Sequence, residues 1–250
     1  NGGKEGEIYR CVRCDTLAPT LSRGRMAGIL FIISAPSGSG KSTLVTEVRR
    51  LVEGLEFSIS YTTREPRGSE EDGREYHFTT RECFLEMVKA GEFLEWAEVF
   101  GNYYGTARSA LEHARVAGKD LLLDIDVQGA VQVMERMPEA VSIFILPPSP
   151  AVLEMRLRNR SQAEGVTEES VIARRLSQAR KELLTLDEYR YALVNDVLEH
   201  AATELRAIVM YERGEGDRDT AAMAEECRTA KHSERLEAVL SSFGVTVAGV

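Results

Sequence analysis

The chain has no run of apolar residues long enough to span a membrane, which takes about 18 consecutive apolar residues. It also lacks an excess of positive charge, because 40 acidic residues outnumber 31 lysines and arginines and leave a net charge of −9. These two absences exclude a membrane-spanning protein and disfavour a general nucleic-acid binder, which usually carries a basic face. Any site for an anionic ligand must therefore be built locally, from clustered arginines and backbone amides.

Cysteine is scarce, with four residues in 250. Cys83 and Cys227 stand alone, and the CxxC pair of Cys11 and Cys14 has no second pair or spaced histidines to complete a zinc site. We therefore expect no disulfide framework, which favours the reducing cytoplasm as the location of the protein. For Cys11 and Cys14, a metal or redox role stands as the alternative to an incidental pair in a flexible tail.

Residues 1–25 differ from the rest of the chain. They are rich in glycine and arginine, show no hydrophobic periodicity and lack the apolar segment of a secretory signal. We expect them to form a disordered leader, with the folded sequence beginning near Met26.

From residue 26 on, short apolar runs alternate with helical patterns. Strands are predicted at 28–34, 120–126, 140–146 and 191–195, and helices at 42–53, 127–136, 150–159, 167–188 and from 199. This alternation is typical of βαβ units and predicts an α/β fold with a parallel central sheet. The core would comprise residues 26–57 and 107–250.

Two segments depart from this alternation. Residues 58–106 contain short alternating pieces separated by glycine-rich turns, which predicts a small β-rich lobe inserted into the core. Residues 219–242 are polar and helix-prone. A helix there could pack on its own core or pair with another subunit, so a homo-oligomer stays open.

Residues 35–42 read A-x-x-x-x-G-K-S between a predicted strand and a predicted helix. Gly38 and Gly40 allow backbone angles that turn successive N–H groups inward, and the helix directs its positive end at the same point. Lys41 can reach the β- and γ-phosphates, and the Ser42 hydroxyl is placed to bind Mg²⁺. The predicted ATP-binding residues are Ala35, Pro36, Ser37, Gly38, Ser39, Gly40, Lys41, Ser42 and Thr43.

Two aspartates follow the apolar residues of the 120–126 strand, at the end where such sheets place their ligands. Asp124 follows the apolar run directly and is the predicted Mg²⁺ ligand, through water. A spacing of two in a strand would put Asp124 and Asp126 on the same face. The alternative for Asp126 is that it caps the next helix.

The inserted lobe contains cations and hydroxyl groups suited to a second phosphate. Arg64 and Arg67 flank Pro66, which limits their arrangement, and two arginines can hold one phosphate by forked hydrogen bonds. Tyr76 and Tyr104 offer phenolic donors for the same group.

The lobe also contains side chains that could distinguish one nucleobase from another. A carboxylate at Glu95 could accept hydrogen bonds from N1 and N2 of guanine, and hydroxyls at Ser60 and Thr106 could donate to O6. Adenine presents the opposite donor and acceptor pattern at this edge. A carboxylate at this position would therefore disfavour it.

At these residues the chain resembles bacterial guanylate kinase, over about residues 27–212. The matching segments, in order, are SAPSGSGKSTL, TTREPR, FLEWAEVFGNYYGT, LLLDIDVQGA, SIFILPPS and VIARRLSQA. The resemblance implies a P-loop NTPase fold of three α/β/α layers, with a GMP-binding lobe at 58–106 and a helical lid at about 156–176. It further implies Mg²⁺-dependent transfer of the γ-phosphate of ATP to GMP, and also to dGMP.

The resemblance also assigns roles to individual residues. It implies a GMP site of Ser60, Arg64, Arg67, Glu70, Tyr76, Glu95, Tyr104, Thr106 and Asp126. It implies catalytic roles for Lys41, Arg64, Arg160 and Arg175. In the lid, Asn159 and Ser161 stand where many relatives have glycines beside the arginine that matches Arg160.

Two alternatives belong to other classes of function. One is a guanylate-kinase-like module that binds proteins, and the complete P-loop with Asp124 argues against it. The other is a kinase of the same fold that acts on a phosphorylated sugar, and the presence of Ser60, Glu95 and Thr106 argues against that.

Overall fold

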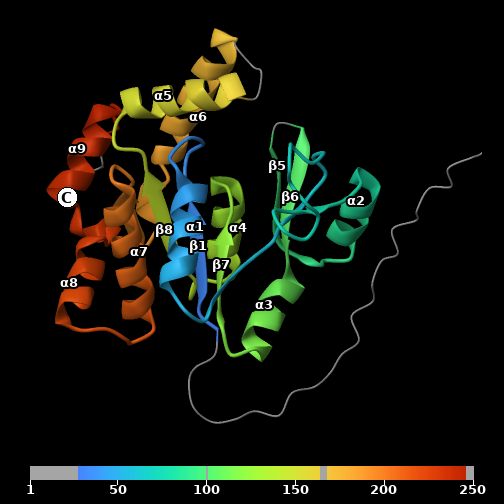
Figure 1. The fold of residues 1–250 in the computed structure, drawn as a ribbon, viewed down its shortest axis with the longest axis horizontal. Coiled ribbons are helices and arrows are strands. Elements are labelled where there is room, and N and C mark those ends of the chain that lie inside the picture. The colour runs from blue at the N-terminus through green and yellow to red at the C-terminus, as the bar shows by residue number, and fades with distance from the viewer. Residues whose placement is uncertain (1–27, 100, 164–167, 246–250) are drawn as a thin grey trace, which may run out of the picture.

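The computed structural model describes residues 28–99, 101–163 and 168–245 (Figure 1). The predicted leader and the Cys11–Cys14 pair lie outside the described residues. None of the helices in the described ranges is long and apolar enough to cross a membrane.

The core is built on a five-stranded sheet in the order β2-β7-β1-β8-β9, with every neighbouring pair parallel. Its strands are β1 (Leu30–Ser34), β2 (Leu55–Phe57), β7 (Asp120–Asp124), β8 (Val141–Leu146) and β9 (Tyr191–Val194). Every residue of β1, β8 and β9 is buried, as expected where helices cover both faces of a sheet. The predicted parallel α/β sheet is confirmed. Strand β2 was missed, because three residues are too short for a recognisable pattern.

Helices cover both faces of this sheet and form the predicted three layers. Phe31 and Ile33 of β1 pack with α1 (Lys41–Leu51) and α7 (Leu198–Glu212). Leu30 and Ile32 face the opposite layer, which holds α3 (Arg108–Val116), α4 (Val127–Arg136), α5 (Pro150–Ala163) and α6 (Glu169–Leu183). Helix α6 is shorter than the predicted 167–188 segment, because a separate 3₁₀ turn, η1 (Leu186–Glu188), follows it.

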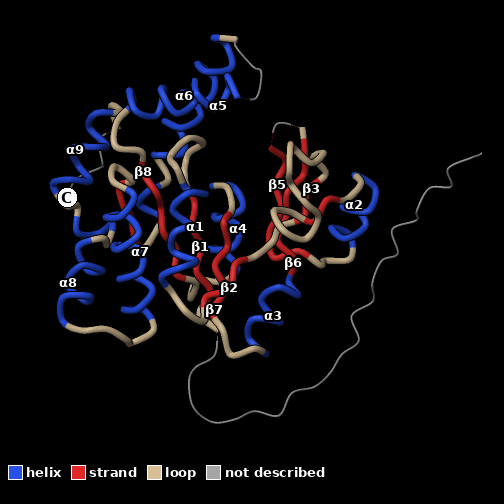
Figure 2. The backbone as a smooth tube through the Cα atoms, in the orientation of Figure 1, coloured by secondary structure: helices blue, strands red, loops and turns tan. Residues whose placement is uncertain are grey.

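The inserted lobe has its own four-stranded sheet, β4-β3-β6-β5, which lies apart from the core sheet in Figure 2. Its elements are β3 (Tyr61–Thr62), β4 (His77–Phe78), α2 (Arg81–Lys89), β5 (Phe93–Val99) and β6 (Asn102–Ala107). Phe84 of α2 stacks on Phe93 and Tyr103, with ring centroids 4.5 and 5.4 Å apart. A small aromatic core therefore supports this lobe, and helix α2 had not been predicted.

The helix-prone C-terminal region forms two helices, α8 (Arg218–Glu226) and α9 (Glu234–Ser242), joined through η2 (Thr229–Lys231). Leu236 and Leu240 of α9 are buried in the core, and Arg235 donates to the carbonyl of Val194 at 3.0 Å. Of the two alternatives for this region, packing on its own core is the one observed.

Candidate active site

The phosphate-binding loop joins the end of β1 to the start of α1. Gly38 and Gly40 have φ of 92° and 87°, in the left-handed region that glycine adopts without strain. A side chain at Gly40 would collide with the amide nitrogen of Asn195, and one at Gly38 would meet Leu153 and Leu157 at 3.0 Å. The loop therefore needs glycine for its conformation and for the space around it.

Lys41 and Asp124 meet at the carboxyl end of β7. Lys41 Nζ lies 2.6 Å from Asp124 Oδ1 and donates to the carbonyl of Ile125 at 2.5 Å. The two side chains are 18% and 29% exposed, so the pair stands at the boundary between the protein interior and the site. An incoming phosphate would find a cation here that is already positioned.

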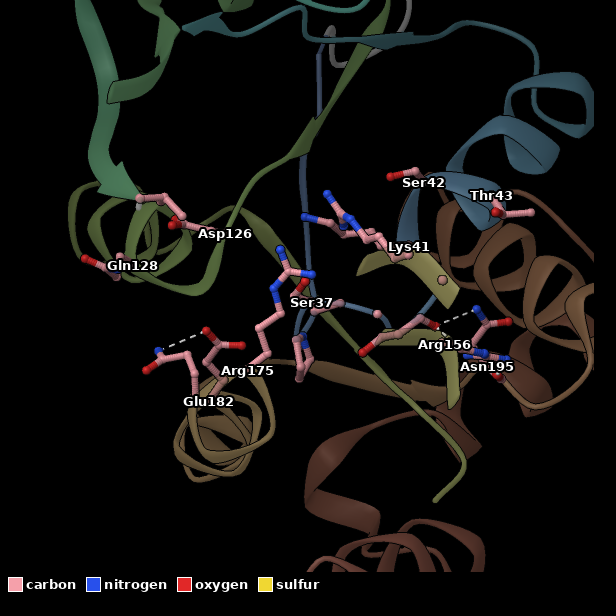
Figure 3. A pocket seen from close by; sticks show the side chains of 18 of the residues that line it. Ser37, Lys41, Ser42, Thr43, Asp126, Gln128, Arg156, Arg175, Glu182 and Asn195 are labelled. Atoms are coloured by element: carbon pink, nitrogen blue, oxygen red, sulfur yellow. Dashed lines mark hydrogen bonds between the residues drawn. The ribbon is translucent and has the colours of Figure 1, made fainter. Parts of the chain in front are cut away.

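A cavity of about 840 Å³ opens over this loop (Figure 3). Its wall includes all nine predicted ATP-binding residues, 35–43, together with the predicted lid arginines Arg160 and Arg175. Figure 3 shows Arg175 and Glu182 across the cavity from Ser42 and Thr43. The remaining lining residues are Glu98, Val99, Asp126, Gln128, Arg156, Arg174, Gln178, Glu182, Asn195, Asp196 and Leu198.

Two residues that the sequence prediction missed tie this loop to the surrounding elements. Asn195 Nδ2 and Arg156 Nη1 both donate to the carbonyl of Ser39, at 2.8 and 3.0 Å, and Arg156 Nη2 donates to the carbonyl of Asn195 at 3.1 Å. Burial lowers the pKa of Arg156. Asn195 could have been found, since it follows a buried parallel strand as Asp124 does. Arg156 gave no signal apart from its place at the start of the predicted lid.

Helices α5 and α6 are joined by Ser161, the residue after Arg160. Arg175 Nη1 on α6 donates to the hydroxyl of Ser161 on α5 at 3.0 Å, and Ser161 is buried. A glycine at this position would offer no acceptor. Arg175 is therefore held at the cavity wall in part by the hydroxyl of Ser161.

In the lobe, four of the predicted phosphate-binding residues lie close together. Arg64 Nη2 donates to both carboxylate oxygens of Glu70, at 3.0 and 2.9 Å, and its guanidinium lies 5.4 Å from the ring centre of Tyr76. The rings of Tyr76 and Tyr104 are 5.9 Å apart. Burial works against the charge of Arg64, but the hydrogen bond and charge of Glu70 outweigh it and raise the pKa of Arg64. Arg67 is exposed, and its backbone N–H donates to Glu70 at 2.8 Å.

The three predicted base-reading side chains also lie together. Ser60 Oγ is 3.3 Å from Thr106 Oγ1, and Thr106 is the register partner of Glu95 across β5 and β6. Glu95 is only 3% exposed. Burial raises the pKa of the Glu95 carboxyl to about 7, against the hydrogen bonding of Thr106, which lowers it. A buried carboxylate beside two hydroxyls can recognise a planar ligand that carries both donors and acceptors.

The prediction that placed Asp126 on the same strand as Asp124 was wrong. Strand β7 ends at Asp124, and Asp126 is the N-cap of α4, accepting from the backbone N–H of Gly129 at 2.8 Å. Of the two alternatives, capping is the one observed, because a carboxylate satisfies the unpaired amides of a helix start. Asp126 still lines the cavity.

The donor side and the lobe act on each other electrostatically. The charge of Asp124 adds to the burial that raises the pKa of Tyr76, and the charge of Lys41 acts on the carboxyl of Glu95. The phosphate-binding loop and the two lobe clusters therefore lie within electrostatic range of one another, around the end of β7.

The residues predicted for Mg²⁺ fit that ion. The hydroxyl of Ser42 and the carboxylate of Asp124 are hard oxygen donors, which Mg²⁺ prefers. No three or more His, Cys, Asp or Glu side chains among the described residues cluster into a metal site.

A glycine-rich loop with a lysine after the first described strand of a parallel sheet, together with a cluster of arginine and tyrosine side chains in an inserted lobe, is typical of the class of P-loop kinases. The family model for guanylate kinase matches residues 28–212. The chain belongs to the guanylate kinase family.

Curated relatives and a solved structure agree with this assignment. The guanylate kinase of Koribacter versatilis is 54% identical over 226 residues, covering 87% of this chain and 97% of that protein. That of Vibrio vulnificus is 44% identical over 216 residues, covering 86% and 98%. The crystal structure of guanylate kinase from Anaplasma phagocytophilum superposes with a TM-score of 0.58 at 32% identity, covering 89% of this chain and 98% of that one.

Proposed function

We propose that this protein transfers the γ-phosphate of ATP to GMP, giving ADP and GDP. The observation that carries the proposal is the position of Glu95. It is a buried carboxylate beside Ser60 and Thr106, and it lies against Gly129 at the start of α4, where Asp126 and Gln128 line the nucleotide cavity. A donor site and a guanine-reading site that meet in this way suit direct transfer between two nucleotides. The related proteins named guanylate kinase support the same reaction.

On the donor side, the backbone amides of the loop hold the ATP phosphates and Lys41 neutralises charge at the β- and γ-phosphates. Lys41 would exchange part of its contact with Asp124 for phosphate oxygens. Arg160 and Arg175 approach the transferring group from the lid, where they stabilise charge that develops in the transition state. Ser42 and Asp124 would hold Mg²⁺, and the ion would supply positive charge that offsets the charge of the ATP phosphates.

On the acceptor side, Arg64 and Arg67 hold the phosphate of GMP, with Tyr76 and Tyr104 as phenolic donors and Glu70 fixing Arg64. Ser60, Glu95 and Thr106 read the guanine, with Asp126 beside them. The proposal extends to dGMP, because none of these side chains is assigned to the ribose.

The chemical step is an in-line displacement. A phosphate oxygen of GMP forms a bond to the γ-phosphorus of ATP, while the bond from that phosphorus to the β,γ-bridging oxygen breaks and leaves ADP. Positioning and charge neutralisation supply the rate, and no protein nucleophile takes part. Because water competes as acceptor, the lobe and lid should close when both substrates are bound. Solution scattering with GMP and a non-reacting ATP analogue should then show compaction.

The deciding test is an ADP-release assay with GMP, dGMP, AMP, UMP and CMP in parallel. We expect turnover with GMP and dGMP and little with the other three, because adenine and the pyrimidines cannot give two N–H groups to Glu95 in the same geometry. Equal activity with AMP and GMP would overturn the guanine assignment. No turnover with any nucleotide, despite ATP binding, would favour a binding module. The proposed location is the cytoplasm, consistent with Cys83 and Cys227, which are unpaired thiols.

A further inference from the structure

Helix α4 belongs to the core, yet side chains on one of its faces are hydrogen-bonded to strand β5 of the lobe. Gln132 Nε2 donates to the carbonyl of Trp96 at 2.8 Å, and Arg136 Nη1 donates to the carbonyl of Leu94 at 2.6 Å. Gly129 lies three residues before Gln132, on the same face of the helix. The backbone on both sides of Glu95 is therefore attached to α4, and Gly129 is the residue of this face that meets the Glu95 side chain.

The contact between Gly129 and Glu95 leaves no room for a larger residue. A Cβ built on Gly129 would lie 3.0 Å from Cδ of Glu95 and closer still to Oε2, and 3.3 Å from Oδ1 of Asp126. Gly129 is buried in the first turn of α4 and does not have a positive φ. Alanine is intrinsically favoured over glycine within helices. Glycine at this position therefore provides space rather than a special backbone conformation, and a larger residue would have to displace the end of the Glu95 side chain.

The strand itself is irregular at the same point. Phe93 pairs with Ala107 and Glu95 with Thr106, so Leu94 is an extra residue in β5. Such bulges re-aim the side chains that follow them. Phe93 packs into the aromatic core of the lobe, while Leu94 is buried in the core on the α4 side. The bulge and the α4 face together set the direction of the Glu95 carboxylate.

We propose that Gly129 is a positioning residue for guanine recognition: its missing side chain is the space in which the Glu95 carboxylate is held against α4. This inference rests on the proposed function, because it concerns the residue that reads the base. It predicts that occupying the space damages GMP recognition, while ATP binding is spared because the phosphate-binding loop lies between β1 and α1.

The test is a Gly129→Ala variant assayed with GMP and with inosine monophosphate, which lacks the N2 amino group. We expect the KM for GMP to rise about 10- to 100-fold, as for a recognition group displaced by about 1 Å. The KM for ATP should stay within about twofold. The preference for GMP over inosine monophosphate should fall, because a displaced carboxylate no longer accepts both N–H groups. Glu135→Ala, an exposed substitution on the same helix, is the matched control and should leave all three values unchanged.

A double-mutant cycle measured by thermal unfolding tests the inference even if Gly129→Ala impairs folding. In the native background the substitution should lower the unfolding midpoint, because it forces the carboxylate out of its place. In a Glu95→Ala background the same substitution should be neutral or stabilising, because the clash is gone and alanine favours the helix. An equal loss of stability in both backgrounds would overturn the inference.

The outcomes separate the inference from the proposed function. A native protein without turnover of GMP contradicts the proposed function itself. A native protein that uses GMP, with a Gly129→Ala variant whose KM for GMP and nucleotide preference are unchanged, contradicts only the role of Gly129.

Discussion

The donor half and the acceptor half of the site are built in opposite ways. The phosphate-binding loop uses mainly backbone, with two glycines at positive φ and a carbonyl, that of Ser39, tied to Arg156 and Asn195. The lobe uses side chains, Arg64, Glu95 and their partners, carried on a small sheet. A backbone cradle recognises phosphate, which every nucleotide has, whereas side chains can distinguish one base from another. Affinity for the donor and identity of the acceptor thus depend on different parts of the chain.

The largest effect should come from Lys41→Ala, which removes the main cationic side chain of the donor half. We expect kcat to fall on the order of 10²–10³-fold, as when a preorganised electrostatic group is removed from an active site. The fold should persist, as checked by circular dichroism and thermal unfolding. Lys119→Ala, which breaks only an exposed ion pair with Glu56, is the control. Near-native turnover without Lys41 would remove the donor half from the mechanism.

The next effect tests the acceptor half through Arg64→Lys. Lysine keeps the charge but loses the fork that pairs with Glu70 and with a phosphate. We expect the KM for GMP to rise about tenfold, with the KM for ATP unchanged. A tenfold rise corresponds to a loss of about 1.4 kcal/mol of binding free energy. Steady-state kinetics with each substrate varied in turn measures this. Arg74→Lys, at an exposed ion pair, serves as control. An equal change in both KM values would mean that the halves are not separate.

A smaller effect concerns pH. Since burial raises the pKa of Glu95 to about 7, most of this group is protonated at pH 6, and a protonated carboxyl cannot accept both guanine N–H groups. We expect kcat/KM for GMP to rise about tenfold between pH 6 and pH 8, reporting the free enzyme. Glu95→Gln should show a low value without this rise. The same dependence in the variant would place the titration elsewhere.

The raised pKa of Glu95 also predicts how the stability of the fold changes with pH. Its folded value lies above the ordinary 4.5, so the native state binds the proton more tightly than the unfolded state does. The contribution of this group to the free energy of unfolding therefore decreases as pH rises from about 4.5 to about 7. Glu95→Gln should remove that part of the dependence.

The smallest effect should come from Ser161→Gly, which removes the hydroxyl that holds Arg175. We expect a loss of about two- to threefold in kcat, in line with one neutral acceptor for a charged donor that can find water instead. Single-turnover kinetics distinguishes slower transfer from slower product release. Ser177→Gly on the neighbouring helix controls for added backbone flexibility. A faster enzyme would show that the hydroxyl restrains the lid rather than supporting it.

Much of the core could be predicted because its signals are local. The apolar runs of β1, β7, β8 and β9 and the spacing of Gly38, Gly40 and Lys41 are legible in short stretches of sequence. The lobe was predicted only in outline, since β3 and β4 are two residues long and α2 is a short helix. Asp126 was placed wrongly because the sequence around it suits either the last residue of a strand or the N-cap of the next helix. Asn195 and Arg156 reach the loop from 156 and 117 residues away, and no local pattern reports such contacts.

The central place of β1 bears on how the protein is made. The strand that precedes the phosphate-binding loop is the first of the described strands to leave the ribosome, but its partners β7 and β8 begin about 90 and 110 residues later. Asn195, which holds the carbonyl of Ser39, comes later still. Contacts between distant segments form slowly, because a long loop must close before they are made. The nucleotide site is therefore completed late in synthesis, and a chain stopped after β7 would carry the phosphate-loop sequence without a finished phosphate site.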